Sequence, residues 1–237
     1  MKDVLDIHTH TLVSGHAYNT IMEMAQAATE KGLELLGITD HAPEMSGGPH
    51  LFYFNNLKVV PRKINGMPVV LGTEVNIMDY DGKLDLPETT LKMMDVVIAS
   101  LHIPCIRPGS KEENTRALVA ALKNPYVNII GHPDDGRYPV DMERVVATAK
   151  EEHKLLELNN HSLNPSGSRV GAKENDIQML KYCMEYQQPI IMGSDAHWAG
   201  DICNHDLAIA LIKEIGFPEE LVVNRSTEEF LTFLNRK

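Results

Sequence analysis

The sequence is poor in cysteine and has no long apolar run. Its 237 residues include three cysteines, Cys105, Cys183 and Cys203, whose wide spacing matches neither a disulfide framework nor a cysteine-rich zinc knuckle. No run approaches the roughly 20 apolar residues of a membrane span, and residues 1–6 lack the apolar core of a signal peptide. We therefore expect a cytoplasmic protein with reduced thiols and no membrane partner.

Low-complexity tracts, internal repeats and linker-like stretches are also missing, which favours a single domain over residues 1–237. Hydrophobic residues make up 43% and charged residues 23%, so a packed globular core is expected. The 22 basic and 33 acidic side chains give a formal charge of −11. Such a surface repels a phosphate backbone and disfavours a nucleic-acid polymer as partner. A homo-oligomer stays open.

Short, β-branched apolar runs alternate with helical patterns along the chain. The runs cover residues 4–7, 35–38, 69–71, 96–100, 127–130, 154–158 and 190–192. Because they are almost continuously apolar, they predict strands buried on both faces of a parallel sheet. Seven such units of about 34 residues each predict an α/β fold and are of the right size for a closed β/α barrel. An open, doubly wound sheet is the alternative.

Helix signals lie between the runs. Apolar residues recur at helical spacing over 20–31 and 110–123, and Asp141 is a candidate cap for the helix that runs to residue 153. Asn175 or Asp176 is the expected start of a further helix, and a capping box at residues 226–229 opens the last one. Residues 42–62 are expected to form a long loop with a late helix.

A histidine or carboxylate stands at the end of six of the seven predicted strands. The candidates are His8, His10, His16, His41, Glu74, His102, His132, Asp195 and His197. Barrel enzymes assemble their active sites at this edge, so these side chains are expected to converge. Imidazole and carboxylate are the ligands of zinc, iron(II) and manganese. Nine ligands exceed one tetrahedral ion, and two or three ions are implied.

The other histidines and Cys105 show weaker signals. His153 lies in a charged helical stretch and is expected at the surface, and His205 is expected near a helix start. His50 and His161 lie on loops at the same edge as the candidate ligands, where they could contact substrate or ligands. Cys105 follows a candidate ligand by three residues but has no paired base, which argues against a nucleophile.

These motifs, in their order and spacing, resemble those of the PHP (polymerase and histidinol phosphatase) superfamily, and the resemblance covers essentially the whole chain. The elements are His8-x-His10, Thr39-Asp40-His41, Glu74, Ser100-Leu101-His102, Gly131-His132-Pro133 and Gly193-Ser194-Asp195-Ala196-His197. Two further elements are most similar to its YcdX-type metal-dependent phosphatases. They are His16-Ala17-Tyr18 and Glu157-x-Asn159-Asn160.

The resemblance implies a distorted (β/α)7, TIM-like barrel with three divalent ions at the C-terminal ends of the strands. Zinc is the usual metal of this subgroup, with manganese and iron(II) as alternatives. Carried over by motif, the first ion is assigned to His8, His10, Glu74 and Asp195. The second shares Glu74 as a bridge and adds His102 and His132. The third is assigned to His16, His41 and His197.

The implied activity is hydrolysis of small phosphate monoesters by a hydroxide that bridges two ions. Asp195, His102 and Glu74 are the expected catalytic residues. Arg169 and Lys173 are the expected phosphate contacts. Asp6 and Asp40 are expected to orient imidazoles as hydrogen-bond acceptors. The alternatives are a phosphodiesterase, an exonuclease or another metallohydrolase, and a metal-binding regulatory module without turnover.

Overall fold

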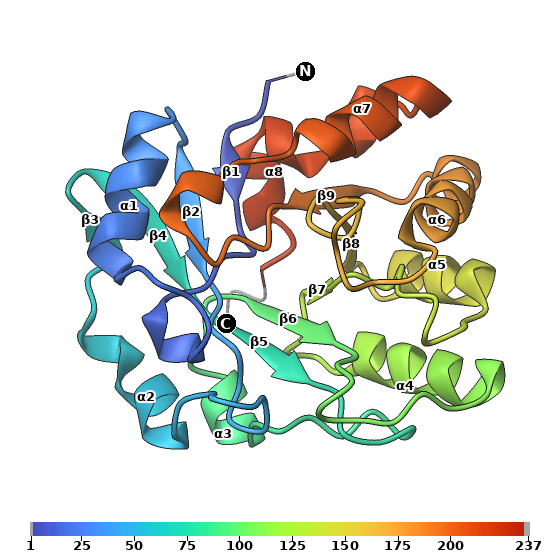
Figure 1. Ribbon diagram of the computed structural model, residues 1–237, viewed down its shortest axis with the longest axis horizontal. Helices are drawn as coiled ribbons and strands as arrows, with labels where there is room; N and C mark the ends of the chain where they lie inside the picture. The colour runs from blue at the N-terminus through green and yellow to red at the C-terminus, as the bar shows by residue number, and fades with distance from the viewer. Residues whose placement is uncertain (1, 235–237) are drawn as a thin grey trace.

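The computed structural model describes residues 2–234, in which strands alternate with helices (Figure 1). Eight strands pair in parallel with one another, and one short strand, β3 (Lys63–Ile64), pairs antiparallel with β4. The parallel strands are β1 (Leu5–Asp6), β2 (Leu35–Ile38), β4 (Met67–Leu71), β5 (Thr73–Asn76), β6 (Val97–Ser100), β7 (Ile129–Ile130), β8 (Leu155–Asn159) and β9 (Ile190–Gly193). The predicted α/β fold with parallel strands is confirmed.

The strands form two sheets, with the orders β1-β2-β4-β3 and β5-β6-β7-β8-β9. The chain passes from one sheet to the other at Gly72, whose N–H donates to Ile38 while the next N–H donates to Val96. A Cβ at Gly72 would lie 2.0 Å from the Val96 carbonyl oxygen, so only glycine fits here. Isolated backbone bridges join the sheets at Thr9–Ala196 and at His41–Glu74.

The change of sheet at Gly72 corrects one detail of the sequence interpretation. Glu74 was expected just after a strand that ends near residue 71. It lies instead inside a separate strand, β5 (Thr73–Asn76), which the apolar pattern did not predict. The reason is that Thr73, Glu74 and Asn76 are polar although all three are buried, so they leave no apolar run.

Eight helices are present among residues 2–234. They are α1 (Ile21–Glu30), α2 (Leu51–Asn56), α3 (Glu88–Leu91), α4 (Lys111–Lys123), α5 (Met142–Glu151), α6 (Ala172–Tyr186), α7 (Asp206–Ile215) and α8 (Thr227–Leu231). Thr20 and Ser110 close capping boxes, and Asp141 caps α5 as predicted. The start predicted for α6 at Asn175 or Asp176 was wrong, because left-handed Gly171 already precedes its first turn.

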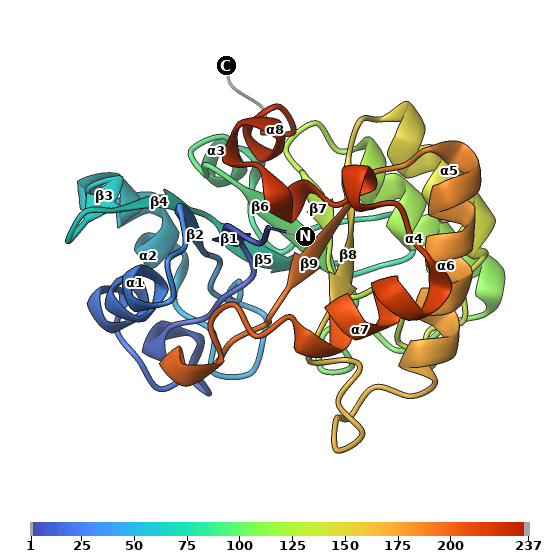
Figure 2. The same ribbon diagram turned by 90° about the horizontal axis from the view of Figure 1, so that it is seen from above.

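Helices α1, α4, α5, α6 and α7 cover the outer faces of the sheets, and α4, α5 and α6 lie in sequence along one side (Figure 2). None of the helices in residues 2–234 is long and apolar enough to cross a bilayer. Ser226 accepts a hydrogen bond from Glu229 N and so caps α8. The late helix of residues 42–62 is α2, which a short 3-10 turn follows at Leu57–Val59.

The larger apolar core lies between the helices and the strands. A second, smaller one fills the space that the strands enclose at their N-terminal ends. Phe230 of α8 and Phe233 after it pack into this core together with strand residues such as Leu155 and Ile191. The same face of β8 continues from Leu155 to Glu157, because side chains two apart share a face of a strand. The enclosed face of such a strand is therefore apolar at the N-terminal end, near α8, and polar at the C-terminal end. A polar site can form at the C-terminal ends.

Candidate metal centre

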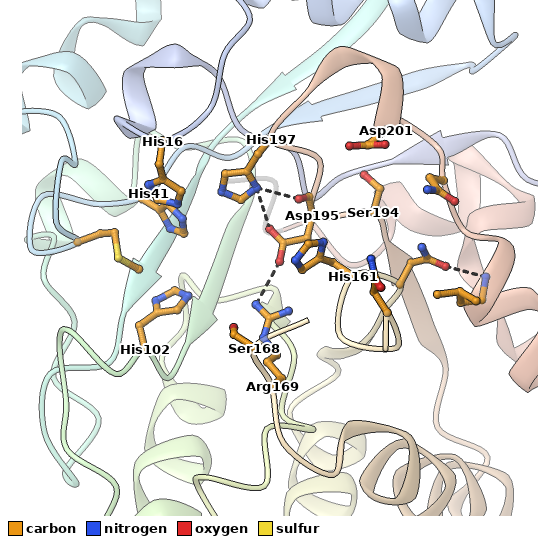
Figure 3. A pocket seen from close by; sticks show the side chains of 15 residues that line it. His16, His41, His102, His161, Ser168, Arg169, Ser194, Asp195, His197 and Asp201 are labelled. Carbon is orange, nitrogen blue, oxygen red and sulfur yellow. Dashed lines mark hydrogen bonds and ion pairs between the residues drawn. The ribbon is translucent and has the colours of Figure 1, made fainter. Parts of the chain in front are cut away.

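All nine predicted ligand side chains come together at the C-terminal ends of the strands. The rings of His10 and His41 have centroids 4.2 Å apart, and those of His10 and His197 are 4.3 Å apart. His16 is exposed and lies at the outer side, 4.9 Å from His41 and 4.7 Å from His197 between ring centroids. Figure 3 shows His16, His41 and His197 facing one another across the pocket, with His102 below them.

Glu74 is fully buried at the centre of this group, and its two oxygens face different histidines. Oε1 lies 2.8 Å from His132 Nε2 and 3.2 Å from His102 Nε2. Oε2 lies 3.4 Å from His8 Nε2 and 3.5 Å from His10 Nε2. A carboxylate that turns one oxygen to each of two imidazole pairs has the geometry of a bridging ligand.

Asp195 extends the group toward Arg169. Its Oδ1 lies 3.3 Å from His10 Nε2 and 3.6 Å from His8 Nε2, and its Oδ2 accepts a hydrogen bond of 3.1 Å from Arg169. Asp195 and His132 both have a positive φ, 55° and 29°. Such backbone is unfavourable for residues with a Cβ and is concentrated at functional sites, where the surrounding structure holds it.

Several ligand atoms of the group are buried without a hydrogen-bond partner. They are His8 Nε2, His10 Nε2, His41 Nδ1, His197 Nε2 and Glu74 Oε2. His41 Nδ1 lies only 2.7 Å from Glu74 Oε2, yet neither has hydrogen-bond geometry. Leaving such atoms unpaired costs about 1–3 kcal/mol each. Ligands of one tetrahedral cation at about 2 Å lie roughly 3.3 Å apart, so separations of 3.3–3.6 Å fit atoms around bound cations.

The electrostatics of the group also favour cations. Burial lowers the pKa of His10 well below its ordinary value, and His41 and His197 add to this effect, so His10 is neutral and free to ligate. Burial also acts to lower the pKa of His8, but the carboxylates of Glu157 and Glu74 outweigh it and raise that pKa well above the ordinary value. The same carboxylates attract any cation placed between them.

The imidazoles of His8 and His102 are held by partners on Nδ1, which leaves their Nε2 turned to the site. Nδ1 of His8 contacts Glu157 Oε1 at 2.7 Å, and Nδ1 of His102 contacts Asn76 Oδ1 at 2.7 Å. Partners of this kind fix the ring orientation and tautomer of metal-binding histidines. The sequence analysis gave Glu157 no role and did not name Asn76, although Asn76 lies two residues after Glu74 and thus on the same face of β5.

The direct roles expected for Asp6 and Asp40 were wrong. Asp40 accepts hydrogen bonds from Thr11, Ser14 and Tyr53, and it reaches His10 only through the Ser14 hydroxyl, which lies 3.2 Å from His10 Nδ1. Asp6 accepts instead from the Ser194 hydroxyl and the Cys203 N–H. Asp40 directly precedes His41 in sequence, but the imidazole that it reaches, through Ser14, is that of His10.

A cavity of about 540 Å³ opens in front of the group, a size typical of small-molecule sites. His161 and Arg169 line it, and Figure 3 shows the Arg169 guanidinium turned toward Asp195. Arg169 is held by Asn159 and Ser162 as well. Lys173, the other expected phosphate contact, lies outside the cavity in an exposed ion pair with Glu214.

The remaining candidates lie elsewhere. His50 caps α2 through its side chain, and exposed His153 stacks on Phe233 as a surface residue. His205 stands at the N-cap of α7 as expected, but its side chain makes no cap hydrogen bond. Cys105 donates to the Glu44 carbonyl, and burial raises the pKa of its thiol to about 12, which agrees with the expectation that it is no nucleophile.

Comparisons with known proteins place the chain in a family. The PHP domain model matches residues 6–163. A "Probable phosphatase" of Clostridium novyi is 48% identical over 237 residues, covering 100% of this chain and 96% of the relative. Another, of Caldicellulosiruptor saccharolyticus, is 51% identical over 230 residues, covering 97% and 95%.

A solved structure shares the fold. It is the histidinol phosphate phosphatase of Lactococcus lactis, complexed with zinc, L-histidinol and phosphate, with a TM-score of 0.63 at 19% identity. The match covers 91% of this chain and 95% of that one. The match to the family model spans well over half of the sequence, and the relatives align over nearly their full length. The chain therefore belongs to the PHP domain family, as a hydrolase among relatives that are named probable phosphatases.

Proposed function

We propose that this protein hydrolyses small phosphate monoesters at a centre of three divalent cations, with zinc as the first candidate and manganese or iron(II) as alternatives. The observation that supports this most directly is the set of buried, unpartnered imidazole nitrogens around Glu74. The proposed ligands are those that the family motif implies. They are His8, His10, Glu74 and Asp195 for one ion, Glu74, His102 and His132 for the next, and His16, His41 and His197 for the third.

Bound cations would supply positive charge for a phosphoryl group and a water acidic enough to act as nucleophile near neutral pH. The chain's own residues hold and orient this charge. Glu74, Asp195 and His102 are the proposed catalytic residues. Glu74 faces both imidazole pairs, and Asp195 stands between His10 and Arg169, where the cavity meets the group. His102 lines the cavity and is oriented by Asn76.

Arg169 is the proposed phosphate contact. Its guanidinium has five N–H donors, and Asn159, Ser162 and Asp195 take three hydrogen bonds from it. The donors that stay free can bind a phosphate oxygen in front of the group. Arginine matches the planar spread of phosphate oxygens better than lysine, and its position is fixed by buried partners.

Size and charge favour a small substrate. The cavity of about 540 Å³ suits a single phosphorylated metabolite, and the formal charge of −11 repels a long polyanion. The named function of the relatives and the phosphate in the Lactococcus lactis structure support a phosphatase over an amide hydrolase. We further infer that the two sheets together make the distorted, seven-unit barrel that the family resemblance implies, in a single domain.

The test is phosphate release from an aryl phosphate by zinc- or manganese-loaded protein, by chelated protein and by Asp195→Asn. We expect activity only with metal and a loss of at least about 100-fold in the variant, as for removal of a transition-state contact. Asp81→Asn is the matched control, since the Asp81 side chain is exposed at 84% and does not line the cavity.

Two outcomes would support the rivals. Faster hydrolysis of oligonucleotides than of mononucleotides would indicate an exonuclease or phosphodiesterase. A preparation that holds about three ions per chain but releases no phosphate from any monoester would contradict the proposal and favour a regulatory metal-binding module. Equal activity of Asp195→Asn and the wild type would contradict the proposed role of Asp195 in catalysis.

A further inference from the structure

A second group of potential ligands lies outside the candidate metal centre. Asp3, Cys203 and His205 each offer one ligand atom, and these atoms all lie within 4.8 Å of one another. Asp3 Oδ2 is 2.7 Å from His205 Nδ1 and 3.8 Å from Cys203 Sγ. The three residues come from the segment before β1 and the loop before α7, two places 200 residues apart in sequence.

The ligand chemistry of this group is specific. One thiolate, one imidazole and one carboxylate suit a borderline cation of the zinc type and not Mg²⁺ or Ca²⁺, which prefer oxygen alone. Tetrahedral zinc with Zn–S of about 2.3 Å and Zn–O of about 2.0 Å sets sulfur and oxygen roughly 3.5 Å apart. The observed 3.8 Å is close to this value, and the 2.7 Å between oxygen and nitrogen needs to widen by only about half an ångström.

The imidazole of His205 is oriented for ligation through Nδ1. Its side chain is fully buried, and its Nε2 has no hydrogen-bond partner, although Asp6 Oδ1 lies 3.6 Å away. A small shift would let Nε2–H donate to Asp6, and Nδ1 would then carry the free lone pair. This carboxylate–histidine–metal arrangement is the usual support of a zinc-binding imidazole.

The solvent access of Asp3 and Cys203 and the backbone conformation at Cys203 are also compatible with a cation site. Asp3 and Cys203 are half-buried, so a cation can enter from solvent and keep a water as fourth ligand. Cys203 has a φ of 56° and its N–H donates to Asp6, so the loop is held with the thiol beside Asp3. Asp3 Oδ1 is buried and unpartnered.

We propose that Asp3, Cys203 and His205 form a separate, structural binding site for a zinc-type divalent cation. In Figure 1 the N-terminal segment passes beside the start of α7. A cation at this site would join that segment to the loop before α7. The loop that it would fasten carries Asp201 and Asn204, two residues of the cavity wall. The cation would therefore stabilise one wall of the substrate cavity without touching substrate.

Cobalt(II) distinguishes this site from the candidate metal centre. Thiolate bound to cobalt(II) gives an intense charge-transfer absorption in the near ultraviolet, and the nine ligands proposed for the centre include no cysteine. We expect this band in the wild type loaded with cobalt(II). Cys203→Ser should abolish it, His205→Asn should weaken or abolish it, and Cys105→Ser, the matched control for a half-buried thiol, should retain it.

Metal content gives a second readout. The wild type should retain one more zinc per chain than Cys203→Ser after removal of free metal, and bound zinc should protect one thiol of the wild type from a disulfide reagent. This protection can be measured even if Cys203→Ser does not fold. Absence of the band in metal-loaded wild type, or no protection of any thiol, would overturn the proposal. His205 would then be a charged imidazole between Asp3 and Asp6.

Discussion

Glu157→Gln tests how the candidate metal centre is built. Glu157 accepts hydrogen bonds on both oxygens, from His8 Nδ1 at 2.7 Å on Oε1, and from the His132 N–H at 2.9 Å and the Asn159 amide at 3.1 Å on Oε2. Glutamine has the same shape but a single acceptor oxygen. In either orientation of the amide, its NH₂ group meets a donor where the carboxylate had accepted.

The expected size of the effect follows from this conflict. Loss of the partner that orients a metal-binding histidine lowers metal affinity by about 10–100-fold, or about 1.4–2.7 kcal/mol. Glu157 also contributes negative charge, since the pKa of His8 is raised chiefly by the Glu157 carboxylate against the effect of burial. Because donor conflict and charge loss act together at a fully buried site, we expect the upper end of this range.

The assay is phosphate release as a function of free zinc, set by chelator buffers. For Glu157→Gln we expect the zinc concentration at half-maximal activity to rise about 100-fold, with much of the activity restored at high zinc. Glu151→Gln is the control, because Glu151 is exposed at the end of α5. Gly193→Ala should act in the same direction, since its Cβ would lie 1.9 Å from Glu157 Oε1.

An unchanged zinc midpoint in Glu157→Gln would refute the reasoning, because the orienting bond would then contribute nothing to metal affinity. Activity that is lost at every zinc concentration while zinc still binds would also contradict it. That outcome would give Glu157 a part in the chemistry and not in holding the ligands.

Three shorter predictions concern other contacts. Asn76→Ala removes the acceptor of His102 Nδ1 and should raise the zinc midpoint about tenfold in the same titration. Arg169→Lys should raise KM for an aryl phosphate at least about tenfold with a smaller change in kcat, because lysine lacks the forked donors. Burial and the Glu157 carboxylate raise the pKa of Asp134 to about 6, and burial with the Asp134 and Glu157 carboxylates raises the pKa of Asp176 well above its ordinary value, so the folded state loses stability as pH rises from about 4 past 6. In urea unfolding of chelated protein, Asp176→Asn should therefore be more stable than the wild type by about 1–3 kcal/mol at pH 8 and by little at pH 4.

The sequence was sufficient to predict most strands and the convergence of the nine candidate side chains, for a physical reason. Strands buried on both faces need continuous apolar residues, and the histidines and carboxylates at their ends interrupt those runs visibly. His102 stands two residues after the end of β6, and Asp195 stands two residues after the end of β9. Because parallel strands end at one edge, neighbours in space could be inferred without knowing any contact.

What the sequence could not show depends on contacts between distant residues. Glu157 and His8 are 149 positions apart, and nothing local to either marks the bond between them. Lys173 was placed in the site because it follows the Arg169 loop, but the helical turn that begins at Ala172 directs it outward to Glu214. Glu74 was predicted to join the histidines, while the strand that carries it was missed, because a strand with buried polar side chains has no apolar pattern.

The break between the two sheets has a consequence for how the protein opens. Hydrogen-bonded ladders end at Gly72 and between β1 and β9, where single bridges replace them, so these seams are the places where local opening needs the least free energy. The proposed ligands stand on both sides: His8 and His10 follow β1, and Asp195 follows β9. A bound cation would then cross-link the two sheets. Amide hydrogen exchange at His10, whose N–H donates to the Ala196 carbonyl across the seam, should report metal occupancy more sensitively than any strand interior does.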